Sequence, residues 1–125
     1  MKIKFTAKIA PVPLGRSRFN TKTKKIYYPK RSKIFKNELG MIGRAAMRGK
    51  APLKGALLVT LDLYKNCKIL SKHYGDVDNH QKSIFDALNE ICYDDDSQIV
   101  KVICEKHKDT IPKIEIQIEE IEISD

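Results

Sequence analysis

Cysteine is scarce in this sequence, and its pattern excludes two common ways of stabilising a small fold, by disulfides and by a structural metal. Cys67, Cys92 and Cys104 are odd in number and far apart, and they include no Cys-x-x-Cys pair. This pattern argues against a disulfide framework and against a structural zinc site. We expect three buried thiols in a reducing cytoplasm.

Long apolar runs are also missing. Residues 1–8 alternate charged and apolar side chains, so they lack the continuous apolar segment of a signal peptide, and no later run approaches the length of a membrane span. We therefore expect a soluble cytoplasmic protein with no membrane partner. A chain of 125 residues is long enough to fold as one domain, residues 1–125, without a covalent or metal staple.

Acidic residues are nearly absent from the first part of the chain. Residues 1–75 contain 19 Lys and Arg against two acids, a net charge of +17, whereas residues 76–125 contain 5 Lys and Arg against 14 acids, a net charge of −9. The asymmetry indicates a basic surface for a polyanion and a separate acidic focus. The alternative interpretation is solvated charge with no partner.

The hydrophobic periodicity predicts an α+β fold. Period-two alternation marks four strands, at residues 2–9, 57–64, 98–105 and 113–119. After the last of them, Glu119 and Glu120 interrupt the alternation, which indicates a bulge or the strand's end. Helical spacing marks a first helix from Ser32, the expected N-cap, and a second from residue 77 or 78 to 91. With a further strand-like segment, we expect a small mixed β-sheet of about four to five strands and two main helices.

The second helix is predicted to have two distinct faces. At about 100° per residue, the core face contains apolar side chains: Val77, Ile84, Phe85, Leu88 and Ile91. A polar stripe of alternating charge occupies another side: Asp78, Lys82, Asp86 and Asn89. Taken alone, the stripe is explained by surface ion pairs at i,i+4 spacing. In the first helix, Gly40 and Gly43 indicate close packing against a neighbour.

A basic segment with interleaved aromatic residues lies between the first strand and the first helix. Its aromatic rings are Phe19, Tyr27 and Tyr28. Cations beside aromatic rings on a loop can hold phosphates and stack on bases, while the alternative is a flexible basic hairpin loop with core aromatics behind it. The DNA-binding candidates, chosen by density, are Arg16, Arg18, Lys22, Lys24, Lys25, Lys30 and Arg31.

The acidic focus consists of two blocks separated by the second helix. Asp76 and Asp78 stand at its start, and their side chains point the same way if the backbone there is extended. One of them could cap the helix, which would not explain both. Asp95 and Asp96 follow the helix and return to Asp76 only if the intervening loop folds over. Converging carboxylates would offer oxygen-only ligands, which Mg²⁺ or Mn²⁺ prefers, and the calcium-loop glycine and glutamate are missing.

A divalent ion beside a lysine and a basic surface suits phosphodiester hydrolysis. Lys82 lies one helical turn after Asp78, so it can neutralise charge on the same phosphate or assist the water or the leaving group. The serines have no convincing His or Asp partners, and no Gly-rich phosphate loop is present, so we expect no nucleotide cofactor.

Two separate blocks carry a family resemblance. Residues 76–90, DVDNHQKSIFDALNE, and residues 93–100, YDDDSQIV, resemble in order the D-x-D-N-x-x-K-x-x-x-D-A-L and D-D-x-Q-V motifs of the RusA family of Holliday junction resolvases, which prophages often carry. Residues 15–19, GRSRF, and 28–30, YPK, also resemble the family's basic N-terminal pattern, in which a proline commonly replaces Ser17.

The resemblance implies a small α+β homodimer that nicks four-way DNA junctions symmetrically with Mg²⁺ or Mn²⁺. Carried over by position, the metal-binding catalytic acids would be Asp76, Asp78 and Asp96, with Asp95 possible in place of Asp96, and Lys82 would be the catalytic lysine. The alternatives are a non-catalytic basic nucleic-acid-binding dimer and a nuclease for other branched DNA.

Overall fold

A computed structural model describes residues 1–15, 18–27 and 29–124, without the side chain of Arg18. Two α-helices, a short 3-10 helix (η1) and six strands lie within these residues. In chain order they are β1 (Lys2–Ala7), β2 (Arg18–Asn20), β3 (Lys25–Tyr27), α1 (Lys30–Met47), β4 (Ala56–Lys65), α2 (Val77–Leu88), η1 (Asp96–Gln98), β5 (Ile99–Lys108) and β6 (Lys113–Ile121).

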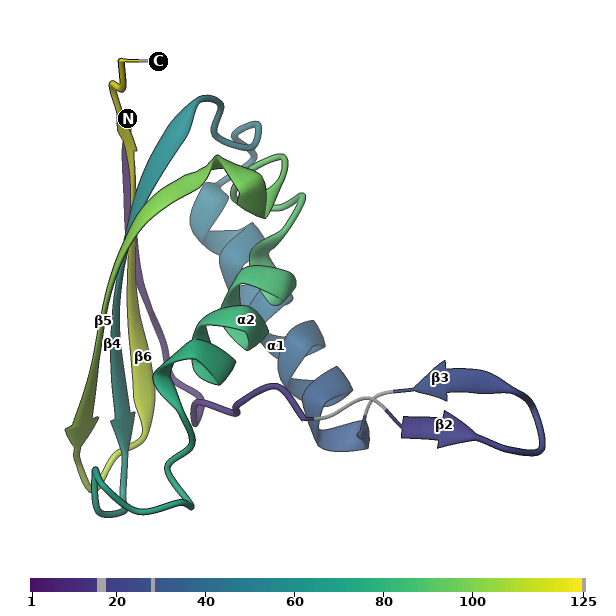
Figure 1. Cartoon of the computed structure of the whole chain (residues 1–125). Helices are drawn as coiled ribbons and strands as arrows, with labels where there is room; N and C mark the ends of the chain where they lie inside the picture. Colours follow the sequence, from purple (N-terminus) through teal and green to yellow (C-terminus); the bar gives the residue numbers. More distant parts are fainter. Residues whose placement is uncertain (16–17, 28, 125) are drawn as a thin grey trace.

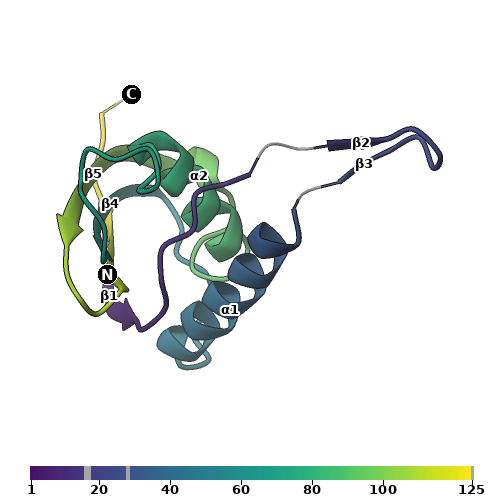
Figure 2. The same ribbon diagram turned by 90° about the horizontal axis from the view of Figure 1, so that it is seen from below.

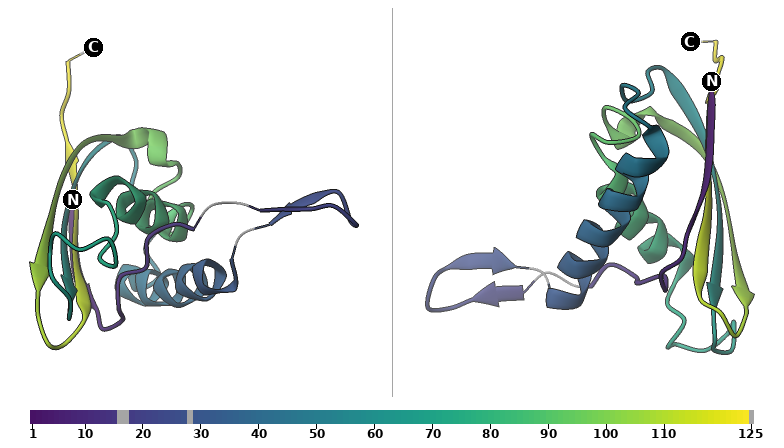
Figure 3. Two further views of the ribbon diagram at one scale, coloured as in Figure 1. Left: turned by 60° about the horizontal axis from the view of Figure 1, so that its bottom comes forward. Right: turned by 180° about the vertical axis from the view of Figure 1, so that it is seen from behind.

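Four strands form one mixed sheet in the order β1-β6-β4-β5. β4 and β5 are parallel, whereas β6 is antiparallel to both of its neighbours, β1 and β4. Both helices lie on the same face of this sheet (Figures 1 and 3). The mixed sheet and the two helices confirm the predicted α+β fold, and the parallel pairing of β4 with β5 makes β4, α2 and β5 a βαβ unit.

The core lies between the sheet and the helices. The inward side chains of β4 and β6 are fully or almost fully buried, as their alternation predicts: Leu57, Val59, Leu61, Leu63, Ile114, Ile116 and Ile118. The expected break at Glu119 and Glu120 is wrong, because β6 continues to Ile121. Glu119 pairs with Lys2 of β1 and Glu120 pairs with Leu57 of β4, so neighbours on both sides extend the strand.

The first helix begins two residues before the predicted N-cap. Pro29 precedes α1, and its carbonyl oxygen accepts hydrogen bonds from the backbone amides of Ser32 (3.0 Å) and Lys33 (3.3 Å). Pro29 is thus the N-cap residue, and no side-chain hydrogen bond caps this end of the helix. The prediction that Ser32 is the N-cap is therefore wrong. Its buried hydroxyl instead accepts a hydrogen bond from the amide of Gly15, 3.1 Å away.

The two helices pack closely at a glycine, as predicted. A Cβ added at Gly43 would stand 2.6 Å from the Leu88 side chain, and one at Gly40 would stand 3.4 Å from the Ala87 carbonyl oxygen. α2 ends at Leu88 rather than at residue 91, because Asn89 has an extended backbone (ψ 136°) and Glu90 a left-handed one (φ 65°).

The buried face of α2 differs in part from the prediction. Ile84 and Leu88 are buried as expected, whereas Val77 is only half-buried. The other buried residues of α2 are His80, Ser83 and Ala87. His80 and Ser83 are polar, so the search for apolar spacing missed them.

Strands β2 and β3 form a separate hairpin that extends away from the sheet and helices (Figures 1 and 2). The exposed fractions are 59% for Phe19, 71% for Ile26 and 41% for Tyr27. The interpretation of this segment as a loop with core aromatics is therefore wrong for Phe19 and Tyr27, while Tyr28 lies outside the described residues. Within the described residues, no helix is long and apolar enough to cross a membrane.

Candidate active site

The loop before α2 is fixed by Tyr74, and this fixes the position of Asp76. The buried hydroxyl of Tyr74 lies 2.8 Å from the carbonyl oxygen of Leu63 on β4 and 2.7 Å from that of His107 on β5. Burial raises the pKa of this hydroxyl to about 12, so it stays protonated. Lys65 and Lys106 stand over the ring, at 5.3 and 5.0 Å from its centroid. The loop is thus tied to the C-terminal ends of the two parallel strands.

Gly75 and His80 complete this support. Gly75 has a φ of 91°, and a Cβ there would stand 3.0 Å from both His80 and Pro13. Glycine is therefore required both by the left-handed backbone and by the lack of room for a side chain. The buried His80 ring donates from Nε2 to the Tyr74 carbonyl oxygen, 2.6 Å away. Burial lowers the pKa of His80 to about 4, so the ring is neutral near pH 7. His80 therefore supports the site without adding a charge.

Asp76 and Asp78 are exposed carboxylates at the start of α2. Asp76 occupies the N-cap position with an extended backbone, but its side chain makes no capping hydrogen bond. Asp78 lies in the first helical turn. Within the described residues, neither carboxylate takes part in a hydrogen bond or an ion pair with a side chain. Helix capping, the structural alternative for one of these acids, is therefore not what Asp76 does.

The three aspartates after α2 have three different environments. Asp94 forms an ion pair with Lys54 at 2.6 Å. Asp95 caps η1, because its carboxylate accepts a hydrogen bond from the amide of Ser97 at 3.0 Å. The amide of Asp95 in turn donates to the side-chain oxygen of Gln98 at 2.8 Å.

The pKa of the Asp95 carboxyl is lowered mainly by a hydrogen bond from the hydroxyl of Ser97 and to a smaller extent by the bond from its amide. Asp96 differs from both neighbours. Its amide donates to the Asn89 side chain at 3.1 Å, and its carboxylate takes part in no bond within the described residues.

Two adjoining hollows contain three of the four predicted catalytic residues, while Asp78 lines neither of them. Asp76 lines one of about 600 Å³ together with Arg31 and Lys72. Asp96 and Lys82 line the next, of about 500 Å³. Two residues line both hollows, Leu14 and Ser32. The structure therefore brings Asp96 to Lys82 and places them next to the hollow of Asp76.

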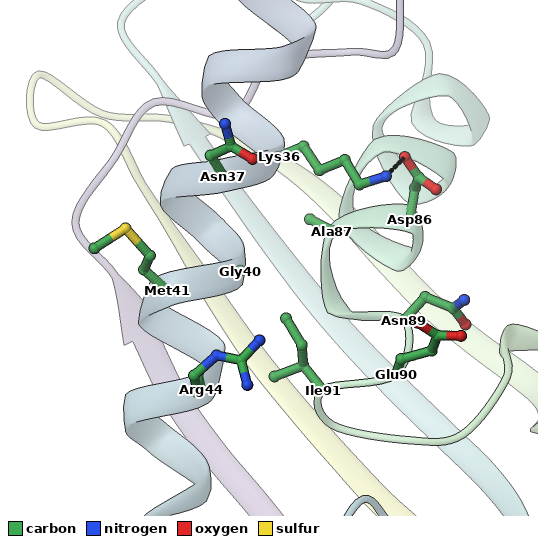
Figure 4. A pocket seen from close by; sticks show the side chains of 10 residues that line it. All are labelled: Lys36, Asn37, Gly40, Met41, Arg44, Asp86, Ala87, Asn89, Glu90 and Ile91. Atoms are coloured by element: carbon green, nitrogen blue, oxygen red, sulfur yellow. Dashed lines mark ion pairs between the residues drawn. The ribbon is translucent and has the colours of Figure 1, made fainter.

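A third hollow, of about 660 Å³, lies between α1 and α2 (Figure 4), and together the three hollows form a groove. Lys36 and Asp86 line both this hollow and the middle one. They form an ion pair of 3.3 Å across the groove, so Asp86 pairs with a lysine of α1 and not with Lys82, the i,i+4 partner that the sequence leaves open for it in the polar stripe. Cations on α1 line the three hollows: Arg31, Lys33, Lys36 and Arg44. Lys33, Lys36 and Arg44 were not assigned to the site from the sequence, although their helical spacing on one polar face of α1 was an available signal.

The donor chemistry of Asp76, Asp78 and Asp96 fits a hard divalent cation, since all three are exposed carboxylates with no other partner in the described part of the chain. Within residues 1–15, 18–27 and 29–124, no three His, Cys, Asp or Glu side chains stand close enough together to hold a metal ion. The structure therefore does not bring the three carboxylates together as one cluster, and their joint binding of a metal ion stays a prediction.

The predicted DNA-binding residues fall into three groups. Arg16 and the side chain of Arg18 lie outside the described residues. Lys22, Lys24 and Lys25 are exposed at the tip of the hairpin. At the start of α1, Lys30 is exposed, and Arg31 lines the hollow of Asp76. The described candidates thus extend from the hairpin tip to the acidic site.

The fold and this site define a small basic α+β protein with carboxylates and a lysine set beside a cationic groove, a composition typical of proteins that act on nucleic acids. A sequence model described as endodeoxyribonuclease RusA matches residues 8–119. The chain belongs to the RusA family, as the two motif blocks predict. It is also 29% identical to the uncharacterized protein YqaN of Bacillus subtilis (strain 168), over 95% of this chain and 96% of that protein. Family membership implies endonuclease activity on DNA.

Proposed function

We propose that this protein is a metal-dependent endonuclease that resolves four-way (Holliday) DNA junctions by paired symmetric nicks, in recombination and repair. The observation that carries the proposal is a set of exposed carboxylates that make no side-chain hydrogen bond or ion pair within the described residues: Asp76 and Asp78 at the start of α2, and Asp96, which shares a lysine-lined hollow with Lys82. Membership of the RusA family supports the same reaction.

Asp76, Asp78 and Asp96 would hold Mg²⁺ or Mn²⁺. When bound, the ion supplies polarisation of the phosphoryl group and a lowered pKa for the attacking water. The ammonium group of Lys82 neutralises negative charge on the scissile phosphate from the hollow that it shares with Asp96. Asp95 takes no part, because its carboxylate is already engaged in capping η1.

The proposed enzyme acts as a homodimer. A four-way junction has two-fold symmetry, and an isologous pair of subunits places one active site on each of two opposed strands. Paired nicks then occur within one bound complex.

The test is incubation of the protein with a synthetic four-way junction in Mg²⁺, Mn²⁺ or EDTA. We expect paired nicks with either metal, none in EDTA, and loss of nicking in Asp76→Asn with junction binding retained. Asp94→Asn is the matched control, since it removes the same charge from an aspartate that pairs with Lys54. Binding without cleavage in every divalent metal would contradict the proposal and favour a non-catalytic binding protein. Flap and Y-shaped substrates in the same assay separate a resolvase from a nuclease for other branched DNA.

A further inference from the structure

The hairpin displays an apolar pair that the rest of the protein leaves uncovered. Phe19 of β2 and Ile26 of β3 are directly opposite in the antiparallel register, so their side chains share one face. Their exposed fractions are 59% and 71%. Two large apolar side chains beside each other in water indicate a surface that is covered when the protein works.

The turn of this hairpin has a defined conformation. The Asn20 side chain accepts hydrogen bonds from the amides of Lys22 and Thr23 at 2.9 and 3.1 Å. The backbone carbonyl oxygen of Asn20 accepts one from the amide of Lys24 at 2.7 Å. Lys24 has a φ of 54°, a left-handed conformation that costs a lysine about 1 kcal/mol. The turn thus keeps a lysine where glycine or asparagine would fit with less strain.

The charge around the apolar pair identifies its partner as DNA. Lys22, Lys24 and Lys25 are exposed at the tip, and no acid occurs in the sequence before Glu38. Cations flanking an apolar pair match phosphates flanking base faces. The hairpin extends beyond the start of α1, where Arg31 lines the hollow of Asp76 (Figure 3). A DNA molecule bound at the acidic site would therefore lie next to the hairpin.

We propose that Phe19 and Ile26 form a wedge that enters the base stack at the branch point of a DNA junction, while the lysines of the turn hold the adjoining phosphates. The inference rests on the proposed function and adds to it a structural element that selects branched DNA. Insertion of an apolar side chain between stacked base pairs of a linear duplex costs unstacking energy. At a branch point the stack is already interrupted, so the wedge gains base contacts there at a lower cost.

The experiment compares Phe19→Ala and Ile26→Ala with wild-type protein in EDTA, which separates binding from cleavage. The control is Ile111→Ala, since Ile111 is also 71% exposed but lies in the turn between β5 and β6. Affinity is measured for a four-way junction and for a linear duplex of the same sequence. We expect Phe19→Ala to lower the preference for the junction by roughly fivefold to tenfold, as expected for loss of one aromatic stacking contact, and Ile26→Ala to lower it by a smaller factor, with duplex affinity nearly unchanged in both.

A junction with 2-aminopurine next to the branch point provides a second readout. Wild-type protein and Ile111→Ala should raise its fluorescence as the base leaves the stack, and Phe19→Ala should not. Wild-type affinities and fluorescence in both hairpin variants would overturn the wedge. A change in the self-association of the DNA-free variants, with junction preference unchanged, would also overturn it and assign the pair to contact with a second copy of the chain. Either result leaves the nicking assay of the wild-type protein as the separate test of the proposed function.

Discussion

The ammonium group of Lys36 on α1 lies 3.3 Å from the carboxylate of Asp86 on α2, and the pair joins the two walls of the groove. The side chains are 54% and 53% exposed, so the pair stabilises the fold by less than about 1 kcal/mol. Its larger effect is on the binding of ligands, since a phosphate in the groove must compete with Asp86 for Lys36.

Substitutions in this pair should have opposite effects on DNA binding. Lys36→Gln should weaken junction binding and reduce the slope of log affinity against log salt by about 0.9, the value for one lost phosphate contact. Asp86→Asn should strengthen binding, because it releases the lysine. Fluorescence polarisation at several salt concentrations measures both effects. Lys54→Gln and Asp94→Asn, which break another exposed pair, serve as controls. Unchanged affinity and salt slope in both Lys36→Gln and Asp86→Asn would show that the groove does not contact DNA.

Asp95 and Asp96 should differ sharply in catalysis. Asp96→Asn should reduce junction nicking at least a hundredfold without changing the thermal midpoint, because its carboxylate holds nothing in the described part of the fold. Asp95→Asn should keep most of the activity, since asparagine also caps helices well. Single-turnover nicking and thermal unfolding of the two variants test this assignment. A larger activity loss in Asp95→Asn would reverse it.

Two glycines of α1 should respond differently to alanine. Gly43→Ala should lower the free energy of unfolding by about 1 to 3 kcal/mol, because the new methyl group would stand 2.6 Å from the Leu88 side chain. Gly40→Ala should be neutral or stabilising by up to about 1 kcal/mol, since its nearest neighbour is at an ordinary 3.4 Å and alanine favours the helix. Urea unfolding of both variants measures the difference. Equal destabilisation would mean that the helices are not spaced as described.

Cys92 should make stability sensitive to alkaline pH. Burial raises its pKa from 9.0 to about 11, so the unfolded chain loses this thiol proton at lower pH than the folded protein does. The stabilising contribution is therefore complete below pH 9 and declines as the pH rises towards 11, by up to about 1.4 kcal/mol per pH unit. Cys92→Ala should show a flatter decline in urea unfolding between these pH values, whereas Cys67→Ala should follow the wild type. Parallel curves for all three proteins would contradict a buried protonated thiol.

Prediction of the fold succeeded where one residue pattern decides the structure. The alternation of Leu57 to Leu63 and of Ile114 to Ile118 sets which side chains are buried, and both strands are confirmed. It failed where distant or polar contacts decide. Ser32 bonds to Gly15 instead of capping a helix, and His80 is buried because Tyr74 supplies a carbonyl partner.

The site was predictable as a set of residue types but not as an arrangement. The two motif blocks identified the family and the acidic residues. Spacing alone could not separate Asp95 from Asp96, because the difference depends on which carboxylate turns back to cap η1. Nor could it find the partner of Asp86, since Lys36 lies on another helix.

The hydroxyl of Tyr74, which contacts β4 and β5 together, also bears on the time scale of motion at the site. Backbone amides of the loop before Asp76 should exchange hydrogen with solvent only when these strands separate, that is, through near-global unfolding. Amides of the β2 and β3 hairpin, which pair only with each other, should exchange by frequent local opening. Within one encounter with DNA, Asp76 therefore stays fixed to the sheet, and the adjustment to the branched substrate falls to the hairpin.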